Sequence, residues 1–117
     1  MKCLEKFESL DCKIAIFVPG TTNINKEADN TIYIHEAAVL LSSLFGGASS
    51  SPVTGYWVSY GDQKLVQENT TIVYANCKKA DLEIYIDEIV TYCLQLCKEL
   101  SQDCIALEVN GTLYFIK

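Results

Sequence analysis

The sequence predicts an α+β domain in which a five-stranded sheet carries two helices on one face. Strand-like and helix-like stretches follow one another in the order β-α-β-β-α-β-β, and a hairpin dipeptide separates the last two. Right-handed crossovers then give a ferredoxin-like βαββαβ sandwich with an extra C-terminal hairpin strand, in the strand order 5-4-1-3-2. Because the 117 residues show no repeat or linker, we expect residues 1–117 to form one domain.

The first strand is expected at residues 13–18, which are apolar on both faces and are followed by Pro19 and Gly20. A strand of this kind belongs in the middle of a sheet. Residues 1–12 fit either a helical turn or an extended segment. Residues 21–29 are expected to form a polar loop.

Two amphipathic helices are predicted. The first is capped by Asp29, Asn30 or Thr31 and is ended by Gly46. Its apolar stripe consists of Ile34, Ala37, Ala38, Leu41 and Phe45. The second is capped by Asp81 and runs to Leu100.

The remaining strands form two hairpins. One pairs residues 54–60 with 65–75, and the polar residues 67–69 indicate a bulge or an exposed stretch. The other pairs residues 104–109 with 112–116 across Asn110–Gly111, a dipeptide typical of a type I′ turn.

Charge and composition exclude several classes of function. The net charge is −6, and nine lysines, with no arginine, are scattered among fifteen acidic residues, so no DNA or RNA partner is expected. No apolar run reaches the roughly 20 residues that a membrane span needs. Acidic residues near the N-terminus also argue against a signal peptide. We therefore expect a cytoplasmic protein without a membrane partner, whose six cysteines are reduced thiols.

The predicted fold brings a serine-rich loop at residues 46–54 to the same sheet end as residues 76–81 and the start of the second helix. Hydroxyls, glycine backbone, ammonium groups and a helix N-terminus are the parts of an anion site, and aromatic rings can stack on a base. The candidate ligand-binding residues are Ser49, Ser50, Ser51, Thr54, Tyr56, Trp57, Lys78 and Lys79. The alternative is a solvated connection in which Asp81 and Glu83 already complement the helix dipole.

Catalytic and metal-binding patterns give no candidate. His35 is the single histidine, which excludes the common His-rich metal sites. Cys93 and Cys97 have the spacing of core residues, and no Cys-x-x-Cys pair exists. We expect no metal and no cofactor, and we identify no catalytic residue; a nucleophilic cysteine acting with His35 is an alternative that no local signature supports.

The predicted architecture leaves one face of the sheet without helices. Ala15, Phe17 and one set of the aromatic residues at 56–60 lie on it. An apolar face of a few hundred square ångströms is more than a soluble monomer usually exposes. We expect a homo-oligomer that forms through this open face. The same aromatic residues could alternatively form a wall that stacks on a base.

Four segments carry a resemblance to known proteins: residues 18–23 (VPGTTN), 44–48 (LFGGA), 55–59 (GYWVS) and 72–77 (IVYANC). Over nearly the whole chain the sequence resembles a family of small α+β proteins from Gram-positive bacteria, their plasmids and phages. The resemblance implies no activity and no catalytic residue. In size and character the chain is also similar to phage anti-defence sponge proteins, although these often bind phosphates with arginine, which is absent here.

These observations lead to one expected function and two alternatives. We expect a non-enzymatic oligomer that binds a small anionic, nucleotide-like ligand, such as a phage or plasmid sponge that sequesters a nucleotide-derived immune signal. The alternatives are a small hydrolase or lyase of such a signal, and a module that binds a host protein through the open face.

Overall fold

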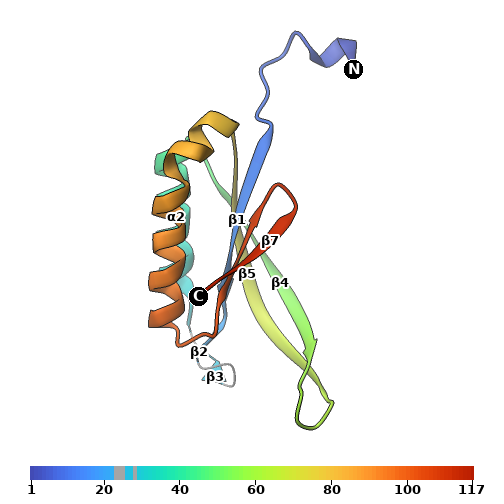
Figure 1. Ribbon diagram of the computed structural model, residues 1–117, viewed down its shortest axis with the longest axis vertical. Helices are drawn as coiled ribbons and strands as arrows, with labels where there is room; N and C mark the ends of the chain where they lie inside the picture. The colour runs from blue at the N-terminus through green and yellow to red at the C-terminus, as the bar shows by residue number, and fades with distance from the viewer. Residues whose placement is uncertain (23–25, 28) are drawn as a thin grey trace.

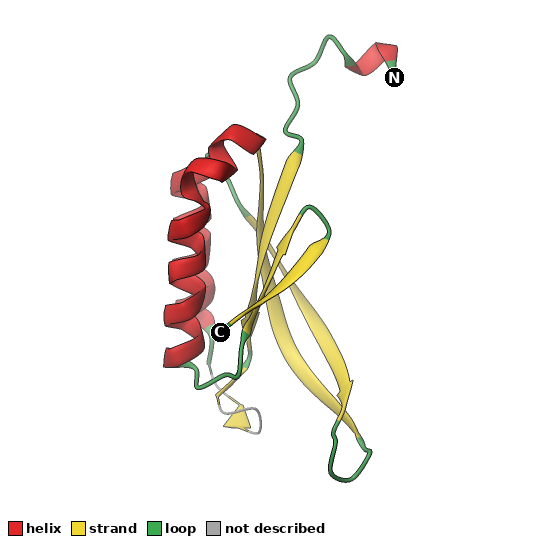
Figure 2. Cartoon of the chain, viewed as in Figure 1, coloured by secondary structure: helices red, strands yellow, loops and turns green. Residues whose placement is uncertain are grey.

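The computed structural model describes residues 1–22, 26–27 and 29–117. Five antiparallel strands form one sheet, and both helices cover the same face of it (Figures 1 and 2). The strand order is β4-β5-β1-β6-β7. When the five strands of this sheet (β1, β4, β5, β6 and β7) are numbered 1 to 5 along the chain, their order from the β7 edge is 5-4-1-3-2. This is the predicted order, so the predicted fold is confirmed.

The main helices and strands follow one another in the predicted order β-α-β-β-α-β-β. The short elements are η1 (Lys2–Leu4), β2 (Thr21–Thr22) and β3 (Lys26–Glu27); the main elements are β1 (Cys12–Pro19), α1 (Thr31–Phe45), β4 (Ser49–Val58), β5 (Leu65–Cys77), α2 (Lys79–Glu99), β6 (Ile105–Val109) and β7 (Thr112–Ile116).

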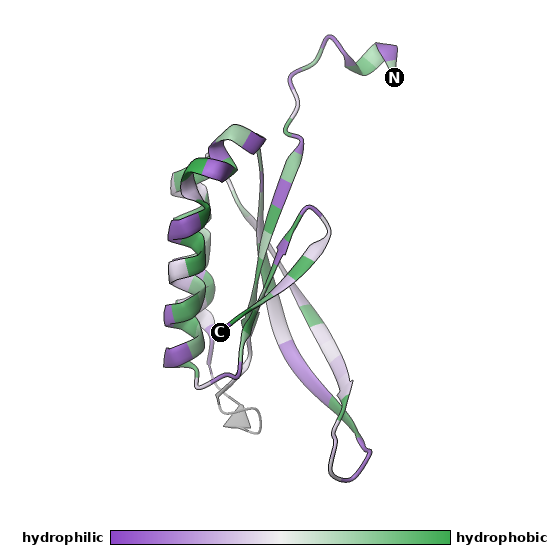
Figure 3. Cartoon of the chain, in the orientation of Figure 1, coloured by the Kyte–Doolittle hydropathy of each residue, from purple (hydrophilic) through white to green (hydrophobic). Residues whose placement is uncertain are grey.

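The hydrophobic core lies between the sheet and the two helices. β1 pairs with β5 at one edge and with β6 at the other, so it lies in the middle of the sheet, as predicted. Ile14, Ile16 and Val18 of β1 are completely buried in this core. Apolar and polar residues alternate along α2, as Figure 3 shows, because only one side of the helix packs against the sheet.

The ends of α1 follow the predicted chemistry. Gly46 adopts a left-handed conformation (φ 90°) and its N–H donates to the Ser42 carbonyl at 2.8 Å, which ends the helix. At the start, the Asp29 carboxylate accepts from the Thr31 N–H at 3.0 Å. The Asn30 amide instead donates to the Pro19 carbonyl at 3.2 Å and ties the helix to the end of β1.

Two predicted boundaries are wrong. The strand expected at residues 54–60 begins at Ser49, because residues 49–58 pair continuously with β5. The serine-rich segment is therefore part of an edge strand rather than a loop. α2 begins at Lys79 with Lys78 as its N-cap, so Asp81 lies in the first turn and does not cap the helix.

Several smaller expectations are resolved. β5 has no bulge at residues 67–69, two of which are exposed. Asn110 and Gly111 both have positive φ, as a type I′ turn requires. The segment expected as a polar loop at 21–29 instead contains the paired strands β2 and β3, and its residues 23–25 and 28 lie outside the described part of the chain. Residues 1–11 form a short 3-10 turn and an exposed segment.

The molecule is elongated, with extents of 54 × 28 × 21 Å. Its radius of gyration is 15.7 Å, whereas a compact chain of this length has about 13 Å. The N-terminal segment and the far end of the β4–β5 hairpin both extend beyond the helix layer (Figure 1). Neither α1 nor α2 combines the length and the apolar character needed to cross a membrane.

Candidate functional site

A cavity of about 180 Å³, here called the sheet-face cavity, opens between β1, β5 and the β6–β7 hairpin. Its lining combines aromatic rings with a carboxylate. The lining residues are Phe17, Pro19, Glu68, Thr70, Gln102, Cys104, Ile105, Ala106 and Phe115.

Strand alternation places the key side chains of this cavity on the open face of the sheet. Phe17 lies between two core residues of β1 that point toward the helices, so its own side chain points to the opposite face. In the ladder between β6 and β7, Phe115 is opposite Ala106. On β5, Glu68 is an even number of residues from Thr70 and from Ile72, the residue that pairs with Phe17, so its side chain is on the same face as theirs. All of them therefore project from the face that carries no helix.

Glu68 is the acidic group of the sheet-face cavity. It is half-buried, and its Oε1 accepts a hydrogen bond of 2.8 Å from the Thr21 hydroxyl. Phe17 and Phe115 line the same cavity. A carboxylate beside aromatic rings attracts a small organic cation, because the carboxylate is negatively charged and the faces of the rings have a negative electrostatic potential.

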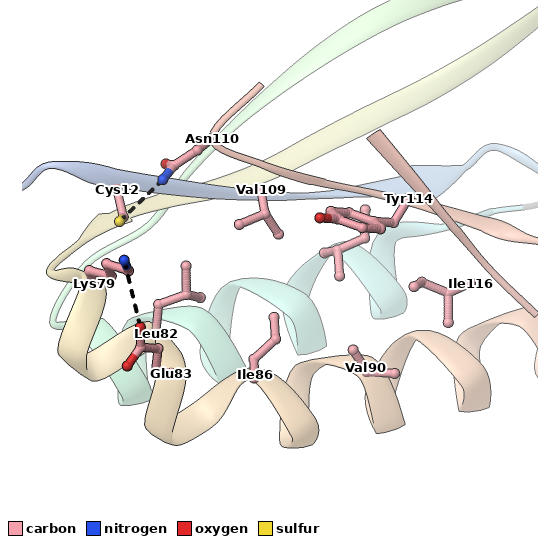
Figure 4. Close-up of a pocket in the computed structure, with 11 residues that line it drawn as sticks. Cys12, Lys79, Leu82, Glu83, Ile86, Val90, Val109, Asn110, Tyr114 and Ile116 are labelled. Carbon is pink, nitrogen blue, oxygen red and sulfur yellow. Dashed lines mark hydrogen bonds and ion pairs between the residues drawn. The ribbon is translucent and has the colours of Figure 1, made fainter. Parts of the chain in front are cut away.

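A second cavity, of about 370 Å³, lies between α2 and the β6–β7 hairpin (Figure 4). Most of its wall is apolar, from residues such as Leu82, Ile86 and Val90. At one end Lys79 forms a 4.0 Å ion pair with the exposed Glu83. We call it the helix–hairpin cavity; it suits an apolar group better than a cation, because its wall offers little polar surface.

The predicted ligand-binding residues on β4 are spread along the strand. Ser49 lines a hollow of about 390 Å³ together with Gly46, Gly47 and Tyr74. Ser50 and Ser51 are exposed. Thr54 lines a different, polar hollow of about 480 Å³, whose lining also includes Asn69 and Thr71.

The other predicted residues lie farther apart still. Trp57 is eight residues from Ser49 on β4, about 26 Å at the usual rise per residue. Tyr56 and Trp57 are on the part of the hairpin that pairs with residues 66–67. Lys78 is exposed, and Lys79 lines the helix–hairpin cavity. Ser49, Thr54 and Lys79 thus line three different hollows, and the eight residues do not share one cavity in the described part of the chain.

The groups considered for metal or thiol chemistry are dispersed. His35 is exposed on α1. The described residues contain no cluster of three or more His, Cys, Asp or Glu side chains placed to hold a metal ion. Cys93 is completely buried in the core, and this burial raises the pKa of its thiol to about 12.

Sequence reasoning missed most of the sheet-face cavity. Phe17 was expected on the open face, and it lies there. Glu68 belongs to the polar run 67–69, whose phase relative to Phe17 could not be predicted because the register between β1 and β5 was unknown. That register is now fixed by the Phe17–Ile72 pair.

Comparisons with known proteins find a relationship at the level of the fold. No protein-family model matches the chain, and no curated protein matches it. Two solved structures are similar to it, both of a phage SAM lyase. The complex with S-methyl-5'-thioadenosine has a TM-score of 0.66 at 15% identity and covers 95% of each chain. The apo state has a TM-score of 0.68 at 16% identity and covers 97% of this chain and 94% of the other. The resemblance noted in the sequence likewise included phage proteins.

Proposed function

We propose that this chain binds a sulfonium nucleoside of the S-adenosylmethionine class at the sheet-face cavity and cleaves its carbon–sulfur bond. The observation that carries the proposal is the half-buried carboxylate of Glu68 in a cavity lined by Phe17 and Phe115. The full-length likeness to a lyase whose structure is a complex with S-methyl-5'-thioadenosine supports the same ligand class. This proposal replaces the anionic ligand expected from the sequence with a cationic one.

The charge of the ligand changes during such a reaction. Heterolysis of the carbon–sulfur bond leaves its electron pair on sulfur, so the sulfonium becomes a neutral thioether such as S-methyl-5'-thioadenosine. The carbon that departs must receive an electron pair. It takes this pair either from the substrate's own carboxylate, closing a lactone, or from a neighbouring C–H bond, whose proton Glu68 would accept in our proposal. Glu68 attracts the substrate more than the product, which favours product release.

The proposed site requires a second copy of the chain. Ligand cavities usually have volumes of about 300–1,000 Å³, whereas the sheet-face cavity alone has about 180 Å³. The open face also exposes Phe115, Leu113 and Trp57, with exposed fractions of 62%, 44% and 41%. We therefore retain the homo-oligomer as part of the proposal, with the open face of one copy enlarging the cavity of another.

The test is product analysis. We would incubate the purified protein with S-adenosylmethionine, denature it and analyse the small molecules by mass spectrometry and NMR. The proposal expects S-methyl-5'-thioadenosine in amounts well above the protein concentration, and NMR of the second fragment separates a lactone from an alkene. A ligand that neither binds nor changes would refute the proposal.

Sequestration without chemistry is the second candidate function. It is favoured by the small set of ionisable groups in the sheet-face cavity, which has one carboxylate, one thiol and no histidine among its lining residues. A phage or plasmid sponge would bind the nucleoside and return it intact after denaturation. The same product analysis therefore distinguishes a sponge from a lyase.

A further inference from the structure

We propose that Thr21 is a positioning residue for Glu68, and that Gly20 and Gln102 hold Thr21 in place. The hydroxyl of Thr21 donates to Glu68 Oε1 at 2.8 Å, although the two residues are 47 positions apart in the chain. The inference deepens the proposed function because Glu68 is the group that recognises the cation there.

Gly20 brings Thr21 next to Glu68 through a close approach of two backbones. The last pair between β1 and β5 is Pro19 with Thr70, but the Gly20 N–H still donates to the Asn69 carbonyl at 2.8 Å. A Cβ at position 20 would lie only 2.6 Å from that carbonyl oxygen. Glycine therefore allows the pairing to continue one step beyond β1, and this step places Thr21 opposite Glu68.

Gln102 fixes Thr21 from the other side. Its backbone N–H donates to the Cys97 carbonyl at 3.0 Å, where the chain leaves α2 through the left-handed Ser101. Its side-chain amide donates to the Leu100 carbonyl at 3.2 Å and to the Thr21 carbonyl at 2.8 Å. The end of α2 is thus linked to Thr21, and Gln102 also lines the sheet-face cavity.

The consequence is a preference for cationic ligands. A glutamate side chain has several rotatable bonds, and the hydrogen bond from Thr21 holds one carboxylate oxygen so that the other is free for a ligand. Because this orientation exists before binding, less conformational entropy is lost when a cation binds. The same carboxylate contributes much less binding free energy to a neutral nucleoside. Thr21 therefore increases the selectivity for charge more than the affinity for adenosine.

The test compares two ligands that differ in charge at the same position. Sinefungin carries an ammonium group where S-adenosylhomocysteine has a neutral sulfur. For Thr21→Val we expect the affinity ratio of the two ligands, measured by calorimetry, to fall about tenfold, as for a lost hydrogen bond to a charged group. Thr21→Ser keeps the hydroxyl and should restore the ratio. Gln95→Leu, on the exposed surface of α2, is the control and should leave it unchanged. An unchanged ratio in Thr21→Val would overturn the inference.

A measurement without ligand separates this inference from the proposed function. If the wild-type protein binds neither compound, the proposed function fails, but the positioning of Glu68 can still be tested. In a crystal structure of ligand-free Thr21→Val, Glu68 should occupy more than one rotamer, whereas Thr21→Ser should show the single wild-type rotamer. One unchanged rotamer in Thr21→Val would contradict the inference.

Discussion

Glu68 is the residue on which the proposed chemistry depends. Its carboxylate is half-buried on the open face and accepts a hydrogen bond from Thr21. A buried or half-buried charge is costly unless it has partners, so a carboxylate held in a cavity beside two phenylalanines is uncommon in a purely structural role. A cationic ligand would place a positive charge beside this carboxylate.

Replacing Glu68 by glutamine tests this role. Glu68→Gln keeps the size of the side chain and removes its charge, so at substrate concentrations below saturation less S-adenosylmethionine is bound and we expect product formation to fall about tenfold. The assay is the time course of S-methyl-5'-thioadenosine release. Glu83→Gln changes an exposed carboxylate of α2 and should behave as the wild type. Equal rates in both variants would remove Glu68 from the mechanism.

The cysteines provide a residue-scale prediction about the core. Cys12, Cys77 and Cys93 are buried, whereas Cys3 is exposed. In the native protein a thiol reagent should therefore modify Cys3 within minutes and leave the other three unmodified until unfolding. Mass spectrometry after timed labelling measures this. Fast modification of Cys93 in the native state would contradict the described core.

The raised pKa of Cys93 also predicts how stability changes with pH. The folded thiol has a pKa of about 12, whereas an unfolded cysteine ionises near about pH 8.5. Between these values the unfolded state loses the proton first. The free energy of unfolding should therefore decline as the pH rises above about 8.5. Urea titrations at pH 8 and pH 10 measure the decline, and Cys93→Ala should reduce it.

At the scale of elements, local chemistry predicted most of the structure. The glycine at the end of α1, the Asn110–Gly111 turn and the apolar β1 strand each depend on conformational preferences of a few residues. The start of β4 could not be predicted in this way. Serines 49–51 have low strand propensity, and they are extended because β5 supplies their hydrogen-bond partners. That information is tertiary and is not present in the local sequence.

The candidate site was harder to predict than the elements. Phe17 could be assigned to the open face from the alternation along β1. The contact between Thr21 and Glu68 could not, since it depends on the strand register and on the Gly20 approach to Asn69. The hydroxyl, aromatic and lysine side chains were candidates because of their chemical types. The structure distributes them along one edge strand and a helix start.

A pair of glycines tests the end of α1. Gly46 has φ 90°, whereas Gly47 lies outside the positive-φ region. A Cβ added at either position would have open space around it, with no contact within 4 Å beyond its chain neighbours. Gly46→Ala should therefore lower the free energy of unfolding by about 1 kcal/mol through backbone strain alone. Gly47→Ala should be neutral or slightly stabilising. Chemical denaturation measures both. Equal effects would show that the left-handed conformation does not end the helix.

At the scale of the whole molecule, the elongated shape and the open sheet face belong together. A chain with extents of 54 × 28 × 21 Å leaves much of its hairpin and one face of the sheet without internal partners. Exposed aromatic and aliphatic residues lie on that face, and the sheet-face cavity opens on it. The proposed oligomer would cover these residues and enlarge the cavity in one step.

Charged substitutions on the open face should break the oligomer. Phe115→Lys introduces a charge where we place the interface, so the oligomer should dissociate to monomers in light scattering coupled to size-exclusion chromatography. Ile84→Lys changes a residue of α2 with a similar exposed fraction, 68% against 62%, and should leave the mass unchanged. A wild-type protein that is already monomeric at micromolar concentration would refute the oligomer.

The central claim is that the sheet-face cavity binds a nucleoside of the S-adenosylmethionine class, and an NMR titration with sinefungin, which carries an ammonium group in place of the sulfonium, tests it most directly. The predicted result is a saturable set of chemical-shift changes centred on Phe17, Thr70, Ala106 and Phe115. Shift changes centred instead on Ser49 and Lys78, changes in the helix–hairpin cavity alone, or an unchanged spectrum at millimolar ligand would contradict the account.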